Sequence, residues 1–138
     1  MSFRVYVYRP HKSQPLPDDS EQWDDWIKAE EQYTLYNEPL GADGTIYHFW
    51  HLIAHQLSLP LIASIYNQGL KLEDEAGFTA LDLELQQLEI YWNTQPLETP
   101  RPPSAIADHV EEHLHERMGY LRNALNLARS EKAVLGIS

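Results

Sequence analysis

Polar or aromatic residues alternate with apolar ones at the start of the chain, where Phe-Arg-Val-Tyr-Val-Tyr covers residues 3–8. A period of two with β-branched and aromatic side chains predicts a strand there. The apolar run over 133–137 predicts a strand at the other end of the chain. A further short strand is expected over 33–36, ended by turn-forming residues between 37 and 44.

Between these strands, apolar residues recur at intervals of three and four, which is the period of an α-helix. Ser20 and Pro60 are suited to begin two of the helices, and Gly69 is suited to end the second. Residues 79–82 resemble a capping box, which would start another helix at about residue 80. The first expected helix begins at residue 21. The others are expected over 45–57, 60–68, 80–92 and 105–130.

Strands at both ends with helices between them favour an α+β fold. We expect the N- and C-terminal strands to pair in a small sheet that packs on the long C-terminal helix. With 138 residues, 43% of them hydrophobic, the chain fits one helix-rich domain over residues 1–138. One continuous apolar face of the long helix contains Ile106, Val110, Leu114, Met118, Leu121, Leu125 and Ala128.

The formal net charge of −11 is concentrated in the middle of the chain. Residues 18–89 contain fifteen acids and only two bases, Lys28 and Lys71. An acidic surface repels phosphate groups, so we expect neither a nucleic acid nor an anionic membrane as a partner. It attracts basic proteins instead. The alternative is that the acidic residues serve solubility alone.

The chain contains no cysteine, which excludes disulfides, thiolate metal sites and cysteine nucleophiles. Residues 1–10 contain no long apolar segment of the secretory type. The stretch 44–70 lacks acids, lysine and arginine, but its central Pro60 and three histidines favour two short helices over a membrane span. We therefore expect a cytoplasmic protein. No Gly-rich phosphate loop or Gly-x-Ser-x-Gly motif is present, so the sequence leaves open whether the chain is an enzyme.

Six of the seven histidines fall in two short segments. His48, His51 and His55 lie at helical spacing on one narrow face of the helix expected over 45–57. Imidazole is the commonest metal ligand and titrates near neutral pH. This face is therefore either a metal or proton site turned toward a second element, or the outer polar stripe of an otherwise buried helix.

The second segment places His109, His113, Glu116 and Tyr120 along one edge of the apolar face of the last helix, whereas His115 points away from the core. Two imidazoles and a carboxylate suit Zn²⁺, Fe²⁺ or Mn²⁺. The alternative is a polar seam in which Glu116 pairs with a neighbouring arginine or faces solvent.

Two tryptophans, Trp23 and Trp26, flank the acidic pair Asp24 and Asp25. Their spacing places both indole rings on one side of a helix, where packing in the core is the simplest role. If one ring is exposed, the helix forms a protein-binding patch rimmed by carboxylates.

Two hypotheses for function follow from the sequence. The first is a non-enzymatic protein-interaction module, a regulator or inhibitor of a basic partner, that uses residues 23–26. The second is a metal-binding protein or metal-dependent enzyme, in which His51 or His55 joins the histidines and the glutamate of the last helix around a divalent ion. A third alternative is a homodimer formed through the tryptophan-rich surface.

Overall fold

The protein is described here by a computed structural model that covers residues 2–10, 15–95 and 110–138. Its strands form one antiparallel sheet in the spatial order β2 (Thr34–Ala42), β1 (Ser2–Tyr8), β4 (Val134–Ile137) and β3 (Leu70–Leu72). The two terminal strands pair directly, with Val5 opposite Ile137 and Tyr8 opposite Val134. This confirms the pairing of the chain ends that the sequence predicts.

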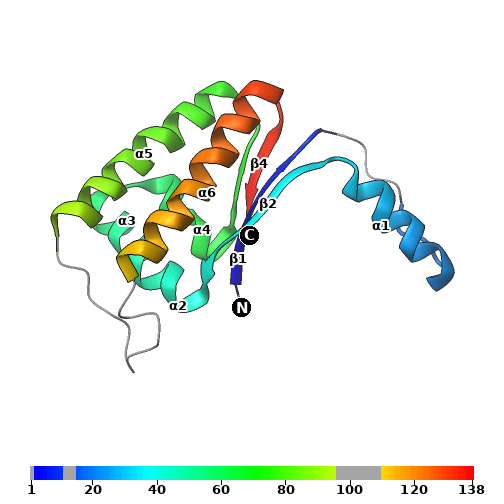
Figure 1. The fold of residues 1–138 in the computed structure, drawn as a ribbon, viewed down its shortest axis with the longest axis horizontal. Helices are drawn as coiled ribbons and strands as arrows, with labels where there is room; N and C mark the ends of the chain where they lie inside the picture. The colour runs from blue at the N-terminus through cyan, green and yellow to red at the C-terminus, as the bar shows by residue number, and fades with distance from the viewer. Residues whose placement is uncertain (1, 11–14, 96–109) are drawn as a thin grey trace.

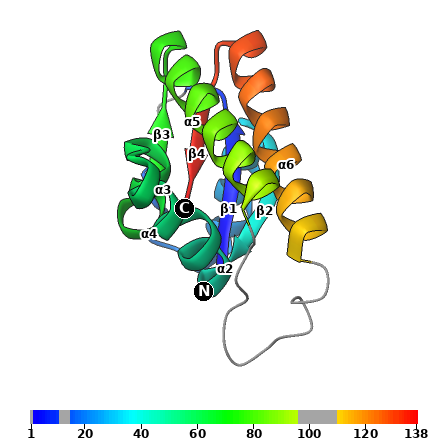
Figure 2. The ribbon, with the colours of Figure 1, turned by 90° about the vertical axis from the view of Figure 1, so that its left-hand side faces the viewer.

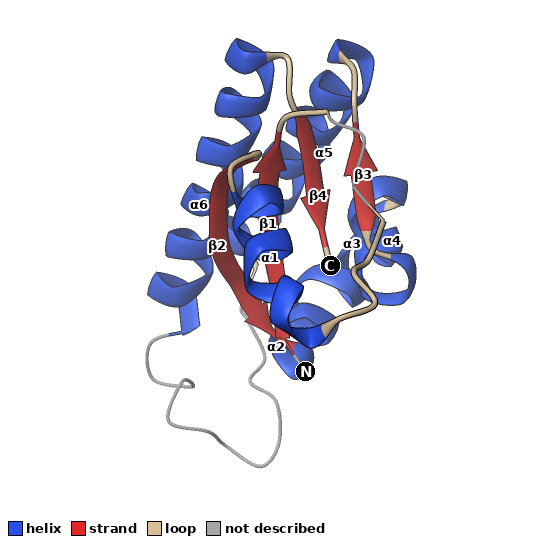
Figure 3. Ribbon diagram, turned by 90° about the vertical axis from the view of Figure 1, so that its right-hand side faces the viewer, coloured by secondary structure: helices blue, strands red, loops and turns tan. Residues whose placement is uncertain are grey.

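Helices form a second layer on one face of this sheet (Figure 2). In chain order the helical segments are η1 (Ser20–Gln22), α1 (Trp23–Glu31), α2 (Asp43–Thr45), η2 (Ile46–His51), α3 (Leu52–Leu57), α4 (Pro60–Gln68), α5 (Glu75–Thr94) and α6 (Val110–Glu131). The long helix α6 packs across β1, β2 and β4 and against α5. The exception is α1, which lies on the opposite face of the sheet (Figures 1 and 3). The helix-rich α+β fold is therefore confirmed.

Strand β2 is longer than the sequence predicts, because it continues through the residues expected to form a turn. Proline cannot donate a hydrogen bond within a sheet, so it is tolerated mainly in edge strands and at bulges. Both conditions hold here. β2 is an edge strand, and its register shifts between the pairs Phe3–Gly41 and Arg4–Pro39, which leaves Leu40 as the extra residue. Strand β3, in a segment expected to be a connector, was not predicted.

Three of the predicted helices differ in detail from the observed ones. The first is capped by Asp19 and not by Ser20, because the Asp19 carboxylate accepts a hydrogen bond from the Glu21 amide at 3.0 Å. α5 begins at Glu75, because the carboxylate of Asp74 accepts a hydrogen bond from the Gly77 amide at 2.8 Å. The predicted capping box at 79–82 is therefore wrong. The helix expected over 45–57 is interrupted by the π-helical segment η2, in which the Leu52 amide bonds to the Tyr47 carbonyl, five residues back.

The core lies between the sheet and the helical layer, and two tryptophans occupy its centre. The Trp50 and Trp92 rings meet edge to face with centroids 5.0 Å apart. Trp92 also donates from Nε1 to the Phe49 carbonyl oxygen in η2 at 2.9 Å. This hydrogen bond ties α5 to the π-helical segment, so Trp92 joins two elements as well as filling space.

A buried acid, Glu84 of α5, holds the start of α4. The residue is 8% exposed, and its carboxylate accepts hydrogen bonds from the amides of Leu61 at 3.2 Å and Ile62 at 3.0 Å. These amides have no partner inside their own helix, because the first turn of a helix always leaves its donors free. Burial raises the pKa of Glu84, and the two amides oppose that rise. Glu84 therefore has a structural role as a helix cap.

Candidate functional site

Helix α1 lies in the long connection between β1 and β2. A backbone hydrogen bond joins the two ends of this connection, because the Arg9 amide donates to the Tyr33 carbonyl oxygen at 2.8 Å. The helix stands on the face of the sheet that α5 and α6 leave open (Figures 1 and 3). Within residues 23–31, none is buried. α1 therefore presents its side chains to solvent and to the outer face of the sheet.

The two tryptophans of α1 pack on each other rather than in the core. Their rings meet edge to face with centroids 5.8 Å apart. Trp23 is 38% exposed, Ile27 is 41% exposed, and Trp26 is half-buried. The core packing suggested by their spacing is therefore absent, and the condition for a protein-binding patch, an exposed tryptophan, is met. Large exposed apolar side chains grouped on one element are typical of interaction sites.

Asp24 and Asp25 lie in the first turn of α1, where carboxylates are favoured by the helix dipole. Both are exposed, and within the described residues neither takes part in a side-chain hydrogen bond or an ion pair. Together with Trp23 and Trp26 they form what we call the α1 patch. The residues of this patch that the sequence singles out are thus adjacent and accessible.

The other acidic run, at 73–75, is used within the fold. Glu73 pairs with Lys71 at 3.0 Å, and Glu75 pairs with Arg129 at 3.2 Å. Asp74 caps α5. The acidic residues of this run are therefore engaged by the chain itself, in contrast to those of the α1 patch.

A groove separates α1 from the outer face of the sheet and has a volume of about 350 Å³. The sheet contributes Tyr6, Tyr8 and Thr34, and the helix contributes Trp26, Ile27, Glu30 and Glu31. The sequence reasoning missed the two tyrosines. The available signal was the alternation in β1, which places both on the side opposite Val5 and Val7, and both are half-buried.

The first histidine segment does not form one continuous face. His51 is only 7% exposed, and its Nδ1 lies 3.0 Å from the Ala63 carbonyl oxygen of α4. Its ring meets that of His55 at 4.6 Å between centroids, whereas His48 is exposed. The π-helical backbone of η2 changes the angle between successive residues, so the ideal helical spacing does not apply. His51 is part of the packing between η2 and α4.

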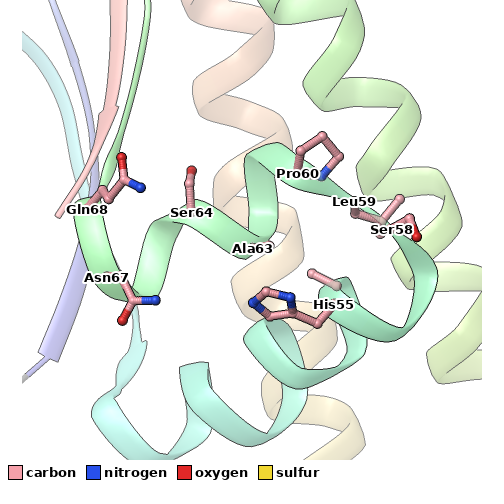
Figure 4. A pocket seen from close by; sticks show the side chains of 9 residues that line it. His55, Ser58, Leu59, Pro60, Ala63, Ser64, Asn67 and Gln68 are labelled. Carbon is pink, nitrogen blue, oxygen red and sulfur yellow. The ribbon is translucent and has the colours of Figure 1, made fainter.

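His55 lies at a second cavity, of about 550 Å³, between α3 and α4. His55 and Ser58 line it from α3 and the residue after it, and Ser64, Asn67 and Gln68 line it from α4 (Figure 4). None of the described residues that line the cavity is an acid, a lysine or an arginine. Ser64 donates its hydroxyl to the Leu61 carbonyl oxygen at 2.7 Å, and among the described residues no hydrogen bond joins His55 to a serine.

The described part of the second histidine segment lies on α6. Glu116 accepts a hydrogen bond from the Tyr120 hydroxyl at 2.7 Å, and Arg117 donates to the Pro39 carbonyl oxygen of β2 at 3.1 Å. Burial and the nearby Arg117 lower the pKa of half-buried His113, and Glu116 opposes this. Glu116 therefore has a partner, the tyrosine of the same stripe.

The remaining two histidines of this segment differ in position. His115 is exposed, as expected, and its ring lies beside that of Trp92 with centroids 6.4 Å apart. His109 lies outside the described residues. The structure thus brings together His51 with His55, and His113 with Glu116. Across residues 2–10, 15–95 and 110–138, no three His, Asp or Glu side chains gather to hold a metal ion.

Comparisons with known proteins add no relative. No family model, no curated protein and no solved structure matches the chain. A search of the described helices for one long and apolar enough to cross a bilayer also finds none.

Proposed function

We propose that this protein is a non-enzymatic binding module that regulates or inhibits a basic protein by docking through the α1 patch. The observation that supports this most directly is the position of α1. It lies outside the core with an exposed tryptophan and two adjacent carboxylates that have no ion pair or side-chain hydrogen bond within the described residues. Tryptophan is among the residues most enriched at the energetic centres of protein interfaces.

The charge around this patch favours a basic partner. Residues 18–31 contain seven acids and one base, Lys28. Opposite charge on the partner speeds the encounter and excludes acidic competitors, and the buried aromatic contacts supply most of the affinity. The interaction is therefore expected to weaken as salt is added, because exposed charges are screened.

The same charge disfavours the homodimer considered above. In a two-fold symmetric dimer the same patch meets its own copy. Asp24 and Asp25 would then face identical carboxylates, and like charges across an interface are repulsive. A partner of opposite charge satisfies the patch, whereas a second copy does not.

To test the proposal, the full chain is used to capture its partner from an extract of cells that produce this protein. The affinity is then measured with the two purified proteins. We expect Trp23→Ala combined with Asp24→Asn and Asp25→Asn to raise the dissociation constant about tenfold or more. The fold of this variant should be intact, because α1 contributes nothing to the core. Circular dichroism and the thermal midpoint check that point.

A matched control removes two exposed carboxylates elsewhere. Glu73→Gln with Glu111→Gln gives the same change in net charge outside α1, at positions that are exposed. This control should bind within about twofold of the wild type. If the α1 variant and the control bind equally well, or if the captured partner is acidic, the proposal is wrong.

A further inference from the structure

We propose that the outer face of α5 binds the same face of a second copy of this chain, as an antiparallel pair of helices. The inference goes beyond the proposed function and does not rest on it, because α5 and α1 lie on opposite faces of the sheet (Figure 1). Figure 2 shows α5 at the outer surface of the helical layer, beside α6. A contact there leaves α1 free for another partner.

The exposed residues of α5 follow one line along the helix. The opposite side of the helix is buried in the core through Leu81, Leu85, Leu88 and Trp92. The exposed line advances in alternating steps of four and three residues, and its members are Ala76, Ala80, Leu83, Gln87, Ile90 and Thr94. This seven-residue repeat is the pattern of helices that pair with another helix. We call the line the α5 heptad face.

Two large apolar side chains of this face are exposed. Leu83 is 58% exposed and Ile90 is 55% exposed. They lie one repeat apart, about 10 Å along the helix axis. Single exposed apolar residues are common at protein surfaces, but large ones grouped on one face of one helix indicate a contact surface.

The α5 heptad face has no charge, although the net charge of the chain is −11. α5 contains four acids and no base. Asp82 and Glu89 both pair with Arg122 of α6 at 3.6 Å. Glu75 pairs with Arg129 of the same helix at 3.2 Å, and the remaining acid caps α4. The acids of α5 are therefore engaged within the fold, away from its heptad face.

A second copy fits this uncharged face better than a charged partner does. A face without charge gives a basic protein no electrostatic attraction. Two copies of an acidic chain repel each other wherever their acids meet, and along this face no acid meets another. A two-fold symmetric contact through the α5 heptad face therefore avoids the repulsion that disfavours pairing through the α1 patch.

The side chains of the face complement each other when one helix is reversed. In an antiparallel pair, Ala80 lies opposite Ile90 of the second copy, and Leu83 lies opposite Gln87. A small residue then faces a large one at the outer layers, so that the two helices pack without a gap. In a parallel pair, Ala80 would face only Ala80 and leave space there. The sizes of the side chains therefore favour the antiparallel arrangement.

The contact is small, so the dimer is expected to be weak. α5 has 20 residues and is about 30 Å long, and one pair of such helices is at the low end of specific interfaces. The polar Gln87 near the middle of the face also reduces affinity while it fixes the register. We expect a dissociation constant of about 10–100 µM.

The test is sedimentation equilibrium of the purified full chain over about 5–500 µM, which should show a monomer–dimer equilibrium. Leu83→Glu with Ile90→Glu places like charges at the contact and should raise the dissociation constant by about twentyfold or more. Gln87→Leu replaces the polar residue of the face by an apolar one and should lower the constant by about fivefold. Both variants should keep the fold, because these positions are exposed, and circular dichroism checks this.

The matched control is Leu16→Glu with Ile27→Glu, which makes the same charge change at exposed apolar positions in the connection between β1 and β2. Its dissociation constant should stay within about threefold of the wild type, because charges far from the contact are screened. A chain that stays monomeric at every concentration, or equal weakening by the two double variants, would overturn the inference.

The arrangement of the two helices is tested by disulfide trapping, because the chain contains no cysteine of its own. Ala80→Cys chains mixed with Ile90→Cys chains under mild oxidation should give mainly the mixed disulfide, with little dimer from either variant alone. Disulfides that form equally well within each variant alone would show a parallel pair and overturn the antiparallel arrangement.

Discussion

Trp92→Ala should lower the free energy of unfolding by about 3–5 kcal/mol, which is among the largest effects expected of a single substitution. Trp92 is 3% exposed, packs on Trp50 and donates a hydrogen bond to the Phe49 carbonyl oxygen. The change removes a large buried ring, leaves a cavity and leaves that carbonyl without its partner. Urea denaturation followed by far-ultraviolet circular dichroism measures the loss.

The chain offers a matched control in Trp23→Ala, which deletes the same side chain from the exposed helix α1. Its cost should stay within about 0.5–1 kcal/mol, because surface substitutions away from the core change stability little. Equal costs for the two substitutions would mean that Trp92 is not at the centre of the core, or that α1 is not outside it.

Glu84→Ala is the second substitution with a large expected effect. It should lower the free energy of unfolding by about 2–3 kcal/mol. The variant leaves the Leu61 and Ile62 amides of α4 without their acceptor in a buried place. Hydrogen bonds to charged groups are stronger than neutral ones, and an unpaired buried donor is costly. Glu111→Ala, at an exposed position of α6, is the control and should cost about 0.5 kcal/mol or less.

The pH dependence of the Glu84→Gln variant tests the environment of this carboxyl group. Burial raises the pKa of Glu84 above its ordinary value of 4.5. The folded protein therefore binds the proton at a higher pH than the unfolded chain does. Proton binding by Glu84 therefore adds stability as the pH falls from neutral toward the ordinary value, and this added stability is lost as the pH rises through the folded pKa.

Unfolding free energies of the wild type and of Glu84→Gln, measured from neutral pH down to about pH 5, should show this difference. The wild type should gain stability relative to the variant on acidification. A constant difference, or a relative loss by the wild type, would contradict the inferred burial of the charge.

The parts of the fold that the sequence predicts well are those with strong local patterns. The alternation at 3–8 and the apolar run at 133–137 correspond to paired strands. Pro60 and Gly69 located α4, and the spacing of apolar residues located α6. The extension of β2 was missed because Pro39 suggests a turn, and only pairing with β1 shows that it lies at a bulge of an edge strand. The π-helical segment η2 carries no comparable signal in a single sequence.

The candidate site was predictable in composition but not in position. Trp23, Asp24, Asp25 and Trp26 stand out from the sequence, yet their spacing suits a buried helix as well as an exposed one. Only the tertiary structure shows that the helix is exposed, because α1 lies on the face of the sheet opposite the helical layer. The groove depends on the same fact, because its two walls come from segments that are distant in the chain.

The metal hypothesis depended on the two histidine segments facing each other. Instead, His51 packs against α4, whereas α6 directs Arg117 toward β2. His109 lies outside the described residues, and the set of metal ligands named from the sequence is not assembled in the part that is described. The interaction hypothesis stays a proposal, and what supports it is the exposed position of α1.

The most direct test of the docking face is hydrogen–deuterium exchange of the full chain, measured alone and in complex with its captured partner. In the free protein, the amides of α1 should exchange faster than those of α5 and α6, because α1 has no buried residue. In the complex we expect new protection in residues 23–31. Protection confined to α3 and α4 or to α6, with α1 unchanged, would contradict the account.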